Sequence, residues 1–259
     1  MVDGLRVEAE GPVATVTLDR PDSLNALTVG LKVALIDAMA SIAGDRTIRV
    51  VILTGAGRAF CAGQDLAERE APDAAPLDVE LRERYHPLLR GMRSMPQPII
   101  AAVNGVAAGA GASIAFACDL RIAAADARFV LAFGRIGLAP DSGMSWTLPR
   151  LVGPARAAEL AMVGEPVSAD EALRIGLISR VARSDLLMDE ARSMAERITT
   201  GAPLALAATK RLLDGAWSID FDEALEIEAR TQALLGASAD HAEGLAAFRE
   251  KRPPRFTGE

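Results

Sequence analysis

The chain has 259 residues, half of them apolar, and its 28 basic and 35 acidic side chains give a net charge of −7. Such a chain can bury a large core in one domain with at most a small appendage, which excludes a disordered protein. The acidic balance and the lack of a basic block argue against a nucleic-acid partner.

The histidine and cysteine counts and the lack of long apolar runs indicate the cellular compartment and the kinds of site to expect. With two histidines and two cysteines that form no CxxC pair, we expect no metal site and a reducing compartment. The N-terminal residues show neither the basic nor the apolar region of a secretion signal, and no run of about 18 uncharged apolar residues occurs. The sequence therefore predicts a cytoplasmic protein without membrane contact.

The first part of the chain alternates between strands and helices. Residues 5–21 hold two alternating runs around Gly11 and Pro12, which is typical of a hairpin. Residues 28–43 have apolar side chains at helical spacing, and residues 49–57 are a β-branched run that ends in glycines. The apolar positions of the helix are Val29, Val33, Ile36, Met39 and Ile42. This order predicts a hairpin, a helix and a central parallel strand joined by a right-handed crossover.

Two less regular segments follow. The stretch FCAGQDL places small residues before Gly63, so we expect an exposed main-chain amide at Gln64, although a plain loop fits the same pattern. Residues 68–87 are polar and interrupted by prolines, which predicts a mobile loop that leads into a helix over 89–95. Loops of this kind often cover ligands. His86 lies there, and a lone histidine beside a tyrosine is more often a packing residue than a catalyst.

Residues 98–149 hold the strongest signal for a binding site. An apolar strand over 98–105 ends at Asn-Gly and leads into a turn of glycine and alanine, after which a buried helix begins. Small side chains let the main chain approach a ligand, and the first amides of a helix lack internal partners. This combination predicts a site for an anion, or for an oxygen that becomes one. Two further short strands are expected in 119–133.

Asp141 lies in a Pro-Asp-Ser-Gly turn before an apolar helix. Its carboxylate can cap that helix by accepting the free amides at the helix start. It can also serve as a catalytic base, because no other carboxylate lies between Asp126 and Glu159 and none lies in the glycine turn. From the residues alone, both interpretations stay open.

The rest of the chain is mostly helical. A capping box at Ser168 and Glu171 opens a short helix, and a last strand follows over 176–181. Four amphipathic helices are predicted over 185–200, 203–213, 221–235 and 239–251. A helical tail after an α/β body usually packs on that body or on a neighbouring subunit. We therefore divide the chain into a core of residues 1–195 and a helical oligomerisation region of residues 196–259.

The motifs FCAGQDL, NGVAAGAGASIAFACDL, IGLAPDSGMSWTLPRLVG and EGLAAFREKRPPRF occur in this order, and with them the chain resembles the crotonase (enoyl-CoA hydratase/isomerase) family. The likeness covers essentially the whole length. It implies an α/β fold built as a spiral of ββα turns, with a helical C-terminal region that forms trimers, often paired into hexamers. It also implies an acyl-CoA thioester as substrate, with coenzyme A as part of that substrate and no separate cofactor.

The resemblance also implies roles for particular residues. The thioester oxygen is expected between the main-chain amides of Gln64 and Ala110, and residues 20–27 resemble the loop on the adenine side. Phe248 and Lys251 resemble residues that reach the coenzyme A of a neighbouring subunit, although a solvated helix end fits them as well. The residues expected to line the substrate pocket are Gly109, Gly111, Ser113, Phe133 and Trp146.

Two departures from the family pattern bear on the reaction. Hydratases of the family use two glutamates to activate a water, and the matching positions here hold Ser113 and Phe133, neither of which can act as a base. The acidic residue is instead Asp141, where hydratases usually carry glycine. A single carboxylate there is typical of the isomerase branches. The motifs are most similar to those of the branch that converts ring-epoxidised phenylacetyl-CoA to oxepin-CoA, and of Δ3,Δ2-enoyl-CoA isomerases.

By this resemblance, Asp141 is expected to move a proton from C2 to C4 of an enolate held by two amides, which shifts a double bond or opens the ring epoxide. Three alternatives stay open: a hydratase, a dehalogenase-like enzyme, and a non-catalytic subunit that binds coenzyme A esters. The dehalogenase branch carries tryptophan at the position of Phe133, which argues against it. Ring-containing and linear acyl groups fit these patterns equally, as do a trimer and a hexamer.

Overall fold

The computed structural model describes residues 4–259, and within them the strands form two sheets. The larger sheet has six strands, β1 (Leu5–Glu10), β2 (Val13–Leu18), β3 (Val50–Gly55), β5 (Ile99–Val103), β7 (Leu120–Ala124) and β10 (Arg180–Ala182), which neighbour one another in this order. β1 and β2 form the predicted antiparallel hairpin. From β2 onward all neighbouring strands are parallel.

The smaller sheet has four strands within the same residues. They are β4 (Ala59–Cys61), β6 (Val106–Ala108), β8 (Arg128–Val130) and β9 (Val167–Ser168). The chain alternates between the sheets, because β3 leads to β4, β5 to β6 and β7 to β8. Helices follow each of these pairs before the chain returns to the larger sheet. The predicted α/β organisation as a succession of ββα turns is therefore present.

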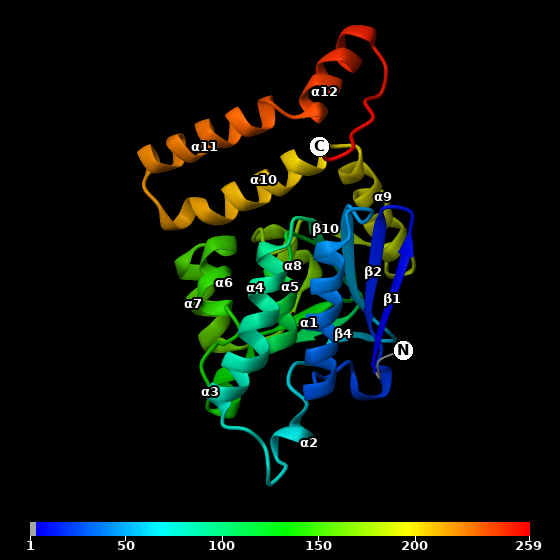
Figure 1. Ribbon diagram of the computed structural model, residues 1–259. Coiled ribbons are helices and arrows are strands. Elements are labelled where there is room, and N and C mark those ends of the chain that lie inside the picture. Colours follow the sequence, from blue (N-terminus) through cyan, green and yellow to red (C-terminus); the bar gives the residue numbers. More distant parts are fainter. Residues whose placement is uncertain (1–3) are drawn as a thin grey trace.

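Helices surround the sheets and extend beyond them at one end (Figure 1). They are α1 (Val29–Gly44), α2 (Leu66–Arg69), α3 (Leu77–Glu80), α4 (His86–Ser94), α5 (Ala110–Ala117), α6 (Met144–Val152), α7 (Pro154–Val163), α8 (Ala169–Arg174), α9 (Leu187–Thr199), α10 (Pro203–Gly215), α11 (Phe221–Gly236) and α12 (Ala239–Glu250). α9 packs against β3, β5 and β7, and α1 packs against α4. All residues of β3 and β5 are buried, which explains their continuous apolar sequences.

The segment between β4 and β5 is more helical than its sequence predicts. After α2, helical structure begins at Leu77 and continues from α3 through a π-helical turn (Leu81–Tyr85) into α4. Tyr85, Leu88 and Met92 recur at helical spacing and are buried, so this run packs on the body instead of forming a loop. Pro76 precedes α3 and Pro87 lies in the first turn of α4, where a missing N–H is tolerated.

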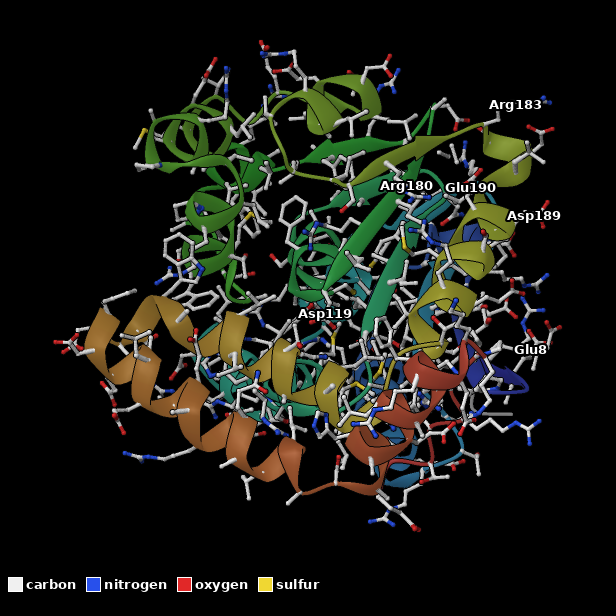
Figure 2. The ribbon with its side chains drawn as sticks, turned by 90° about the horizontal axis from the view of Figure 1, so that it is seen from above. Glu8, Asp119, Arg180, Arg183, Asp189 and Glu190 are labelled. Carbon is white, nitrogen blue, oxygen red and sulfur yellow. The ribbon has the colours of Figure 1, made fainter. Side chains whose placement is uncertain are left out.

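The last three helices form an extension above the body (Figure 1). α10 is anchored by Lys210, whose Nζ donates to the carbonyls of Met92 (2.9 Å) and Gln97 (3.1 Å) and pairs with Asp119 (2.9 Å). Asp119 is labelled in Figure 2, which views the molecule from this end. The division proposed between residues 195 and 196 falls inside α9. Among the helices within residues 4–259, none has the length and apolarity to cross a bilayer.

Candidate active site

Two turns that contain glycine lie against each other after β4 and β6. Gly63 has a φ of +92°, and a Cβ atom there would lie 2.8 Å from the Ala108 carbonyl oxygen and 3.4 Å from the Ala110 nitrogen. A side chain would clash with this carbonyl, so the close contact requires glycine. The contact places Gln64 and Ala110, the two expected amide donors, in neighbouring turns.

Local hydrogen bonding decides where these two amides point. The Leu27 N–H donates to the Gly63 carbonyl (2.8 Å) and the Asp65 N–H donates to the Leu27 carbonyl (3.2 Å), so residues 27 and 64 form a parallel bridge. Because N–H groups alternate sides along extended chain, the Gln64 amide points away from Leu27. Ala110 is the first residue of α5, and the first amides of a helix have no acceptor inside it.

Gly111 sets how closely α5 approaches β4. A Cβ atom on Gly111 would lie 2.3 Å from the Cys61 carbonyl oxygen, so a larger residue would push the helix away. The Cys61 thiol is itself buried and donates to the Asn25 carbonyl (3.2 Å). Burial raises the pKa of this thiol to about 12, which leaves it protonated and unreactive near neutral pH.

Asp141 does not cap the helix that follows it. α6 begins at Met144 with Gly143 before it, and no side chain caps its start. The Asp141 main-chain carbonyl accepts from the Met144 N–H (2.9 Å) and from the Ser113 hydroxyl (3.2 Å). Ser113 is fully buried, so its hydroxyl fixes the turn that carries Asp141. The capping interpretation is therefore wrong, and the Asp141 carboxylate is available for another role.

The Asp141 carboxyl group lies in an environment that disfavours its charge. Its Oδ1 atom and the Ser142 hydroxyl are both buried, and neither has a hydrogen-bond partner within residues 4–259. Burial raises the pKa of Asp141 above its ordinary value, and the adjacent Ser142 hydroxyl opposes this effect only in part. Two neighbouring unpaired polar atoms are unusual in a folded protein, and they indicate a place where a ligand completes the hydrogen bonding.

The two aromatic residues expected in the pocket lie on either side of this turn in the chain. Phe133 is buried in the 3₁₀ turn Ala132–Ile136. Trp146, in the first turn of α6, is stacked between the guanidinium groups of Arg93 (4.0 Å) and Arg150 (3.8 Å), measured to the ring centroid. Trp146 also lines a cavity of about 260 Å³ together with Leu89, Ser142 and Gly143. The indole therefore lies beside the turn that carries Asp141.

A polar network around Gln64 was missed by the sequence analysis. The Gln64 Oε1 atom accepts from Lys32 Nζ and from the Tyr85 hydroxyl, both at 2.8 Å, and Lys32 also pairs with Glu80. The predicted apolar face of α1 was wrong at Val33, which is 44% exposed, while Lys32 is fully buried. The spacing of residues 32, 35, 39 and 42 places this lysine on the buried stripe of α1, and that signal was available.

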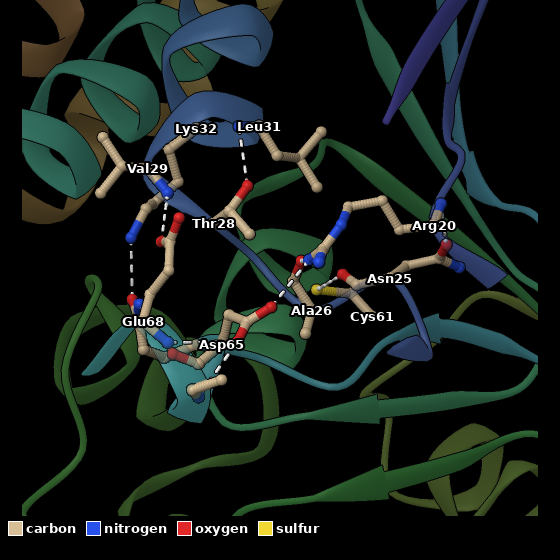
Figure 3. A network of polar contacts seen from close by, with 12 residues as sticks. Arg20, Asn25, Ala26, Thr28, Val29, Leu31, Lys32, Cys61, Asp65 and Glu68 are labelled. Carbon is tan, nitrogen blue, oxygen red and sulfur yellow. Dashed lines mark hydrogen bonds and ion pairs between the residues drawn. The ribbon is translucent and has the colours of Figure 1, made fainter. Parts of the chain in front are cut away.

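A second group of contacts joins the stretch between β2 and α1 to the turn after β4 (Figure 3). Arg20 Nη1 donates to the Ala26 carbonyl (2.5 Å) and to Asp65 Oδ2 (2.9 Å). Asp65 Oδ1 accepts from the first amides of α2, and Glu68 Oε2 accepts from the Val29 N–H (2.7 Å). Residues 20–27, expected near the adenine, are thus held together with the Gln64 turn.

The remaining predicted residues lie elsewhere. Phe248 is 85% exposed near the end of α12, and Lys251 ends that helix in a left-handed conformation with φ +55°. Both are on the C-terminal extension, where a neighbouring molecule can reach them. His86 is half-buried at the first position of α4, directly after Tyr85.

Comparison with known proteins gives a consistent result. The family model described as "Enoyl-CoA hydratase/isomerase" matches residues 8–259. The chain is 41% identical over 262 residues to the 1,2-epoxyphenylacetyl-CoA isomerase of Escherichia coli K12, and the match covers 100% of both chains. It is 39% identical over 255 residues to the (E)-benzylidenesuccinyl-CoA hydratase of Thauera aromatica, covering 97% of this chain and 98% of the relative. The crystal structure of an enoyl-CoA hydratase from Bacillus anthracis superposes with a TM-score of 0.93 at 35% identity, covering 99% of this chain and 100% of the other.

Proposed function

Because the chain belongs to the enoyl-CoA hydratase/isomerase family, we propose that it is an acyl-CoA isomerase that uses Asp141 as its acid and base. The family and its α/β fold, both predicted from the motifs, are confirmed over nearly the whole chain. The chain is thus a member of a family of enzymes that act on acyl-CoA thioesters. The choice of isomerisation over hydration is our proposal.

The chemistry divides between the main chain and one carboxylate. Removal of a proton from the carbon beside a thioester carbonyl leaves an enolate whose charge lies mainly on oxygen. The amides of Gln64 and Ala110 donate to that oxygen, and one such donor lowers a barrier by roughly 2.7–4 kcal/mol in other enzymes. Asp141 takes the proton from C2 and returns it to C4, or to the opened ring of an epoxide. No cofactor is required beyond the coenzyme A of the substrate.

The observation that carries this proposal is the state of Asp141. Asp141 is half-buried, its Oδ1 atom is fully buried without a hydrogen-bond partner within residues 4–259, burial raises its pKa, and its turn is tied to α5 by Ser113. A base with these properties accepts a proton readily. The two positions where family hydratases carry glutamates hold Ser113 and Phe133, so a second carboxylate that could help to activate a water is missing from them.

The substrate class follows from the same reasoning. The relative at 41% identity is named for 1,2-epoxyphenylacetyl-CoA, which favours a ring-epoxide substrate that rearranges to oxepin-CoA. A linear 3-enoyl-CoA converted to 2-enoyl-CoA requires the same proton transfer. We further propose a homotrimer or a dimer of trimers in which Phe248 and Lys251 reach the coenzyme A of the neighbouring subunit.

The test replaces the carboxylate by an amide. Asp141→Asn should lower the isomerisation of 3-hexenoyl-CoA, and the exchange of the C2 hydrogens of phenylacetyl-CoA in D₂O, by about 10²–10⁴-fold. The affinity for phenylacetyl-CoA, measured by calorimetry, should change little. Asp126→Asn, at an exposed position before β8, is the matched control and should retain both activities. If Asp141→Asn retains the parental rates, Asp141 is not the base. A parental preparation that binds the ester without exchange would indicate a non-catalytic binding subunit.

Hydration is the second candidate, because relatives of similar identity are named hydratases. Crotonyl-CoA incubated with the protein in ¹⁸O-water distinguishes the two reactions. For an isomerase, the label should enter a 3-hydroxyacyl product slowly or not at all, while 3-hexenoyl-CoA is converted rapidly. Label uptake faster than double-bond migration would reverse the order of the two candidates.

A further inference from the structure

Lys32 is a buried ammonium group to which the proposed reaction assigns no role. Its side chain has no exposed surface, and its Nζ donates to Gln64 Oε1 (2.8 Å) and pairs with the Glu80 carboxylate. The Tyr85 ring centroid lies 4.9 Å from the ammonium nitrogen. A side chain without exposed surface does not touch a substrate, so any effect on the reaction must act through its neighbours.

These neighbours come from three separate parts of the chain. Lys32 belongs to α1 and Gln64 to the turn after β4, whereas Glu80 and Tyr85 belong to the residues 66–85 that follow this turn. Glu80 is itself buried and holds a second cation, Arg84. The single ammonium group therefore joins the helix, the turn and the segment 66–85.

The contacts fix Gln64 on both sides. Its Oε1 atom accepts two hydrogen bonds, from Lys32 and from the Tyr85 hydroxyl, which uses both lone pairs of that oxygen. Its main chain is held through the bridge to Leu27. The side chain and the backbone of Gln64 are thus both constrained. The direction of its main-chain N–H is therefore set before any ligand binds.

Stability alone is a poor explanation for this lysine. Lys32 lies on the same stripe of α1 as Leu35, Met39 and Ile42, all of which are buried. Removing an ammonium group from water costs free energy that an ion pair often fails to recover, and an apolar residue at such a site is often equally stable. The contacts of the Lys32 ammonium group with Gln64 and Glu80 explain its position better than a contribution to stability does.

We propose that Lys32 is a positioning residue. Together with Tyr85, it holds the Gln64 side chain in place and so orients the main-chain N–H of Gln64 towards the thioester oxygen. Through its pair with Glu80, the same ammonium group couples the orientation of this N–H to the packing of residues 66–85 on the body. The inference rests on the proposed role of the Gln64 amide. Beyond that role, the inference assigns to the buried Lys32 charge the preorganisation of the Gln64 main-chain donor, without any contact between Lys32 and the substrate.

The test reads the polarisation of the thioester directly. Phenylacetyl-CoA labelled with ¹³C at the carbonyl is bound to the full-length protein, and the carbonyl stretch is recorded by difference infrared spectroscopy. Well-aimed donors lower the stretching frequency. In Lys32→Met the frequency should move back towards that of the free ester, and kcat for isomerisation should fall roughly 10- to 100-fold with a small change in KM, because modest misplacement of a donor costs this much.

Lys210→Met is the matched control. Lys210 is also a buried lysine paired with a carboxylate, Asp119, but it anchors α10 and has no contact with Gln64. This variant should lose stability while retaining the infrared frequency and kcat. If Lys32→Met and Lys210→Met give the same frequency and the same kcat, the proposal is wrong.

The pH profile adds a readout that a purely structural role would not change. Burial lowers the pKa of Lys32, the carboxylates of Glu80 and Glu68 oppose this effect, and Arg84 adds to it. The Tyr85 ring also faces the ammonium group. Loss of the ammonium proton on the alkaline side breaks the pair with Glu80, so kcat of the parental protein should decline there. Lys32→Met should lack this decline, and an identical decline in both proteins contradicts the proposal.

A second variant covers the case in which Lys32→Met fails to fold. Gln64→Met keeps the main-chain amide but removes the acceptor for Lys32 and Tyr85, and it should raise the carbonyl frequency in the same way. A parental frequency in Gln64→Met would show that holding the Gln64 side chain does not orient the main-chain N–H. The infrared result does not depend on which residue is the base. If Asp141→Asn retains activity, the proposed isomerase mechanism is wrong, but the infrared comparison of the Lys32 and Gln64 variants still tests the positioning role.

Discussion

Asp141 is the residue on which the proposed chemistry depends, and its surroundings favour the proposed role as a base. The turn that carries it is held through its main chain by the Ser113 hydroxyl and by the first amide of α6, and the buried Oδ1 atom of the carboxyl group has no partner within residues 4–259. A paired carboxylate would be more stable as an anion and therefore a weaker base. The ionised Asp141 side chain is therefore unfavourable for folding, and the proposed role as a base would account for its presence in this turn.

The unfavourable burial of the Asp141 charge predicts a pH-dependent difference in stability between the parental protein and Asp141→Asn. Because burial raises the folded-state pKa of Asp141 above its ordinary value of 3.8, its contribution to stability is fully present below that value and is lost as pH rises through the folded-state pKa. Asp141→Asn cannot ionise, so it should melt at a higher temperature than the parental protein at pH 7. The gain should shrink as pH is lowered towards 4. Thermal melts between pH 4 and pH 8 measure it, and a gain independent of pH would contradict the burial argument.

Gly63 is the second residue with a clear test. Gly63→Ala places a Cβ atom 2.8 Å from the Ala108 carbonyl in a backbone conformation that disfavours side chains. We expect a loss of about 1–3 kcal/mol in the free energy of unfolding, measured by urea denaturation, and a fall in kcat because the two amide-bearing turns separate. Gly91→Ala, in α4 with open space around it, is the control and should be neutral or stabilising by up to about 1 kcal/mol.

At the scale of elements, the stretch between β2 and α1 is joined to the turn after β4 by one ion pair. Arg20 and Asp65 are both mostly buried, and the pair connects residues that are 45 positions apart. Asp65 also accepts from the first amides of α2, so the pair orders the start of the segment 66–85. The position of the Gln64 turn is therefore determined jointly by the stretch between β2 and α1 and by the start of α2.

The pair between Arg20 and Asp65 predicts a measurable contribution to stability. Arg20→Met should lower the free energy of unfolding by about 1–3 kcal/mol, because it leaves a largely buried carboxylate without its partner. Arg6→Met is the control, since Arg6 pairs with Asp19 at an exposed surface, and it should cost about 0–1 kcal/mol. Urea denaturation of both variants measures the difference. Equal losses would show that the buried pair has no special role.

At the scale of the whole molecule, the C-terminal extension exposes a group of large apolar side chains. Leu213, Trp217 and Phe221 lie where α10 turns into α11, and each is more than 60% exposed. This corner is the left end of the extension in Figure 1. Exposed apolar residues gathered in this way mark an interaction surface. In the proposed trimer, this corner would be covered by a second copy of the chain.

Mutation of this corner tests the assembly. Trp217→Glu places a charge in the apolar group, and the mass from sedimentation equilibrium should fall from that of a trimer or hexamer towards that of a monomer. Trp217→Phe keeps an apolar ring and should retain the parental mass. A parental protein that sediments as a monomer at micromolar concentration would refute the assembly.

The sequence by itself determined the features that depend on local patterns. Apolar runs and turn residues predicted the hairpin, the parallel strands and the C-terminal helices, and the motifs predicted the family. They also identified Asp141 as the lone carboxylate of its region. The predictions of the elements and of the family succeeded because strand and helix periodicity, and the backbone conformations that glycine turns require, are properties of neighbouring residues.

Tertiary structure decided what depends on residues far apart in the chain. The packing of residues 77–94 as a helix, the burial of Lys32 against Gln64 and Glu80, and the tie from Ser113 to Asp141 could not be read from local spacing. Each depends on which surfaces meet, and the same side chain can be a solvated charge or a buried one according to its partner. The sequence identified Asp141 and the two glycine turns, and only the packing of distant elements determined how they are held.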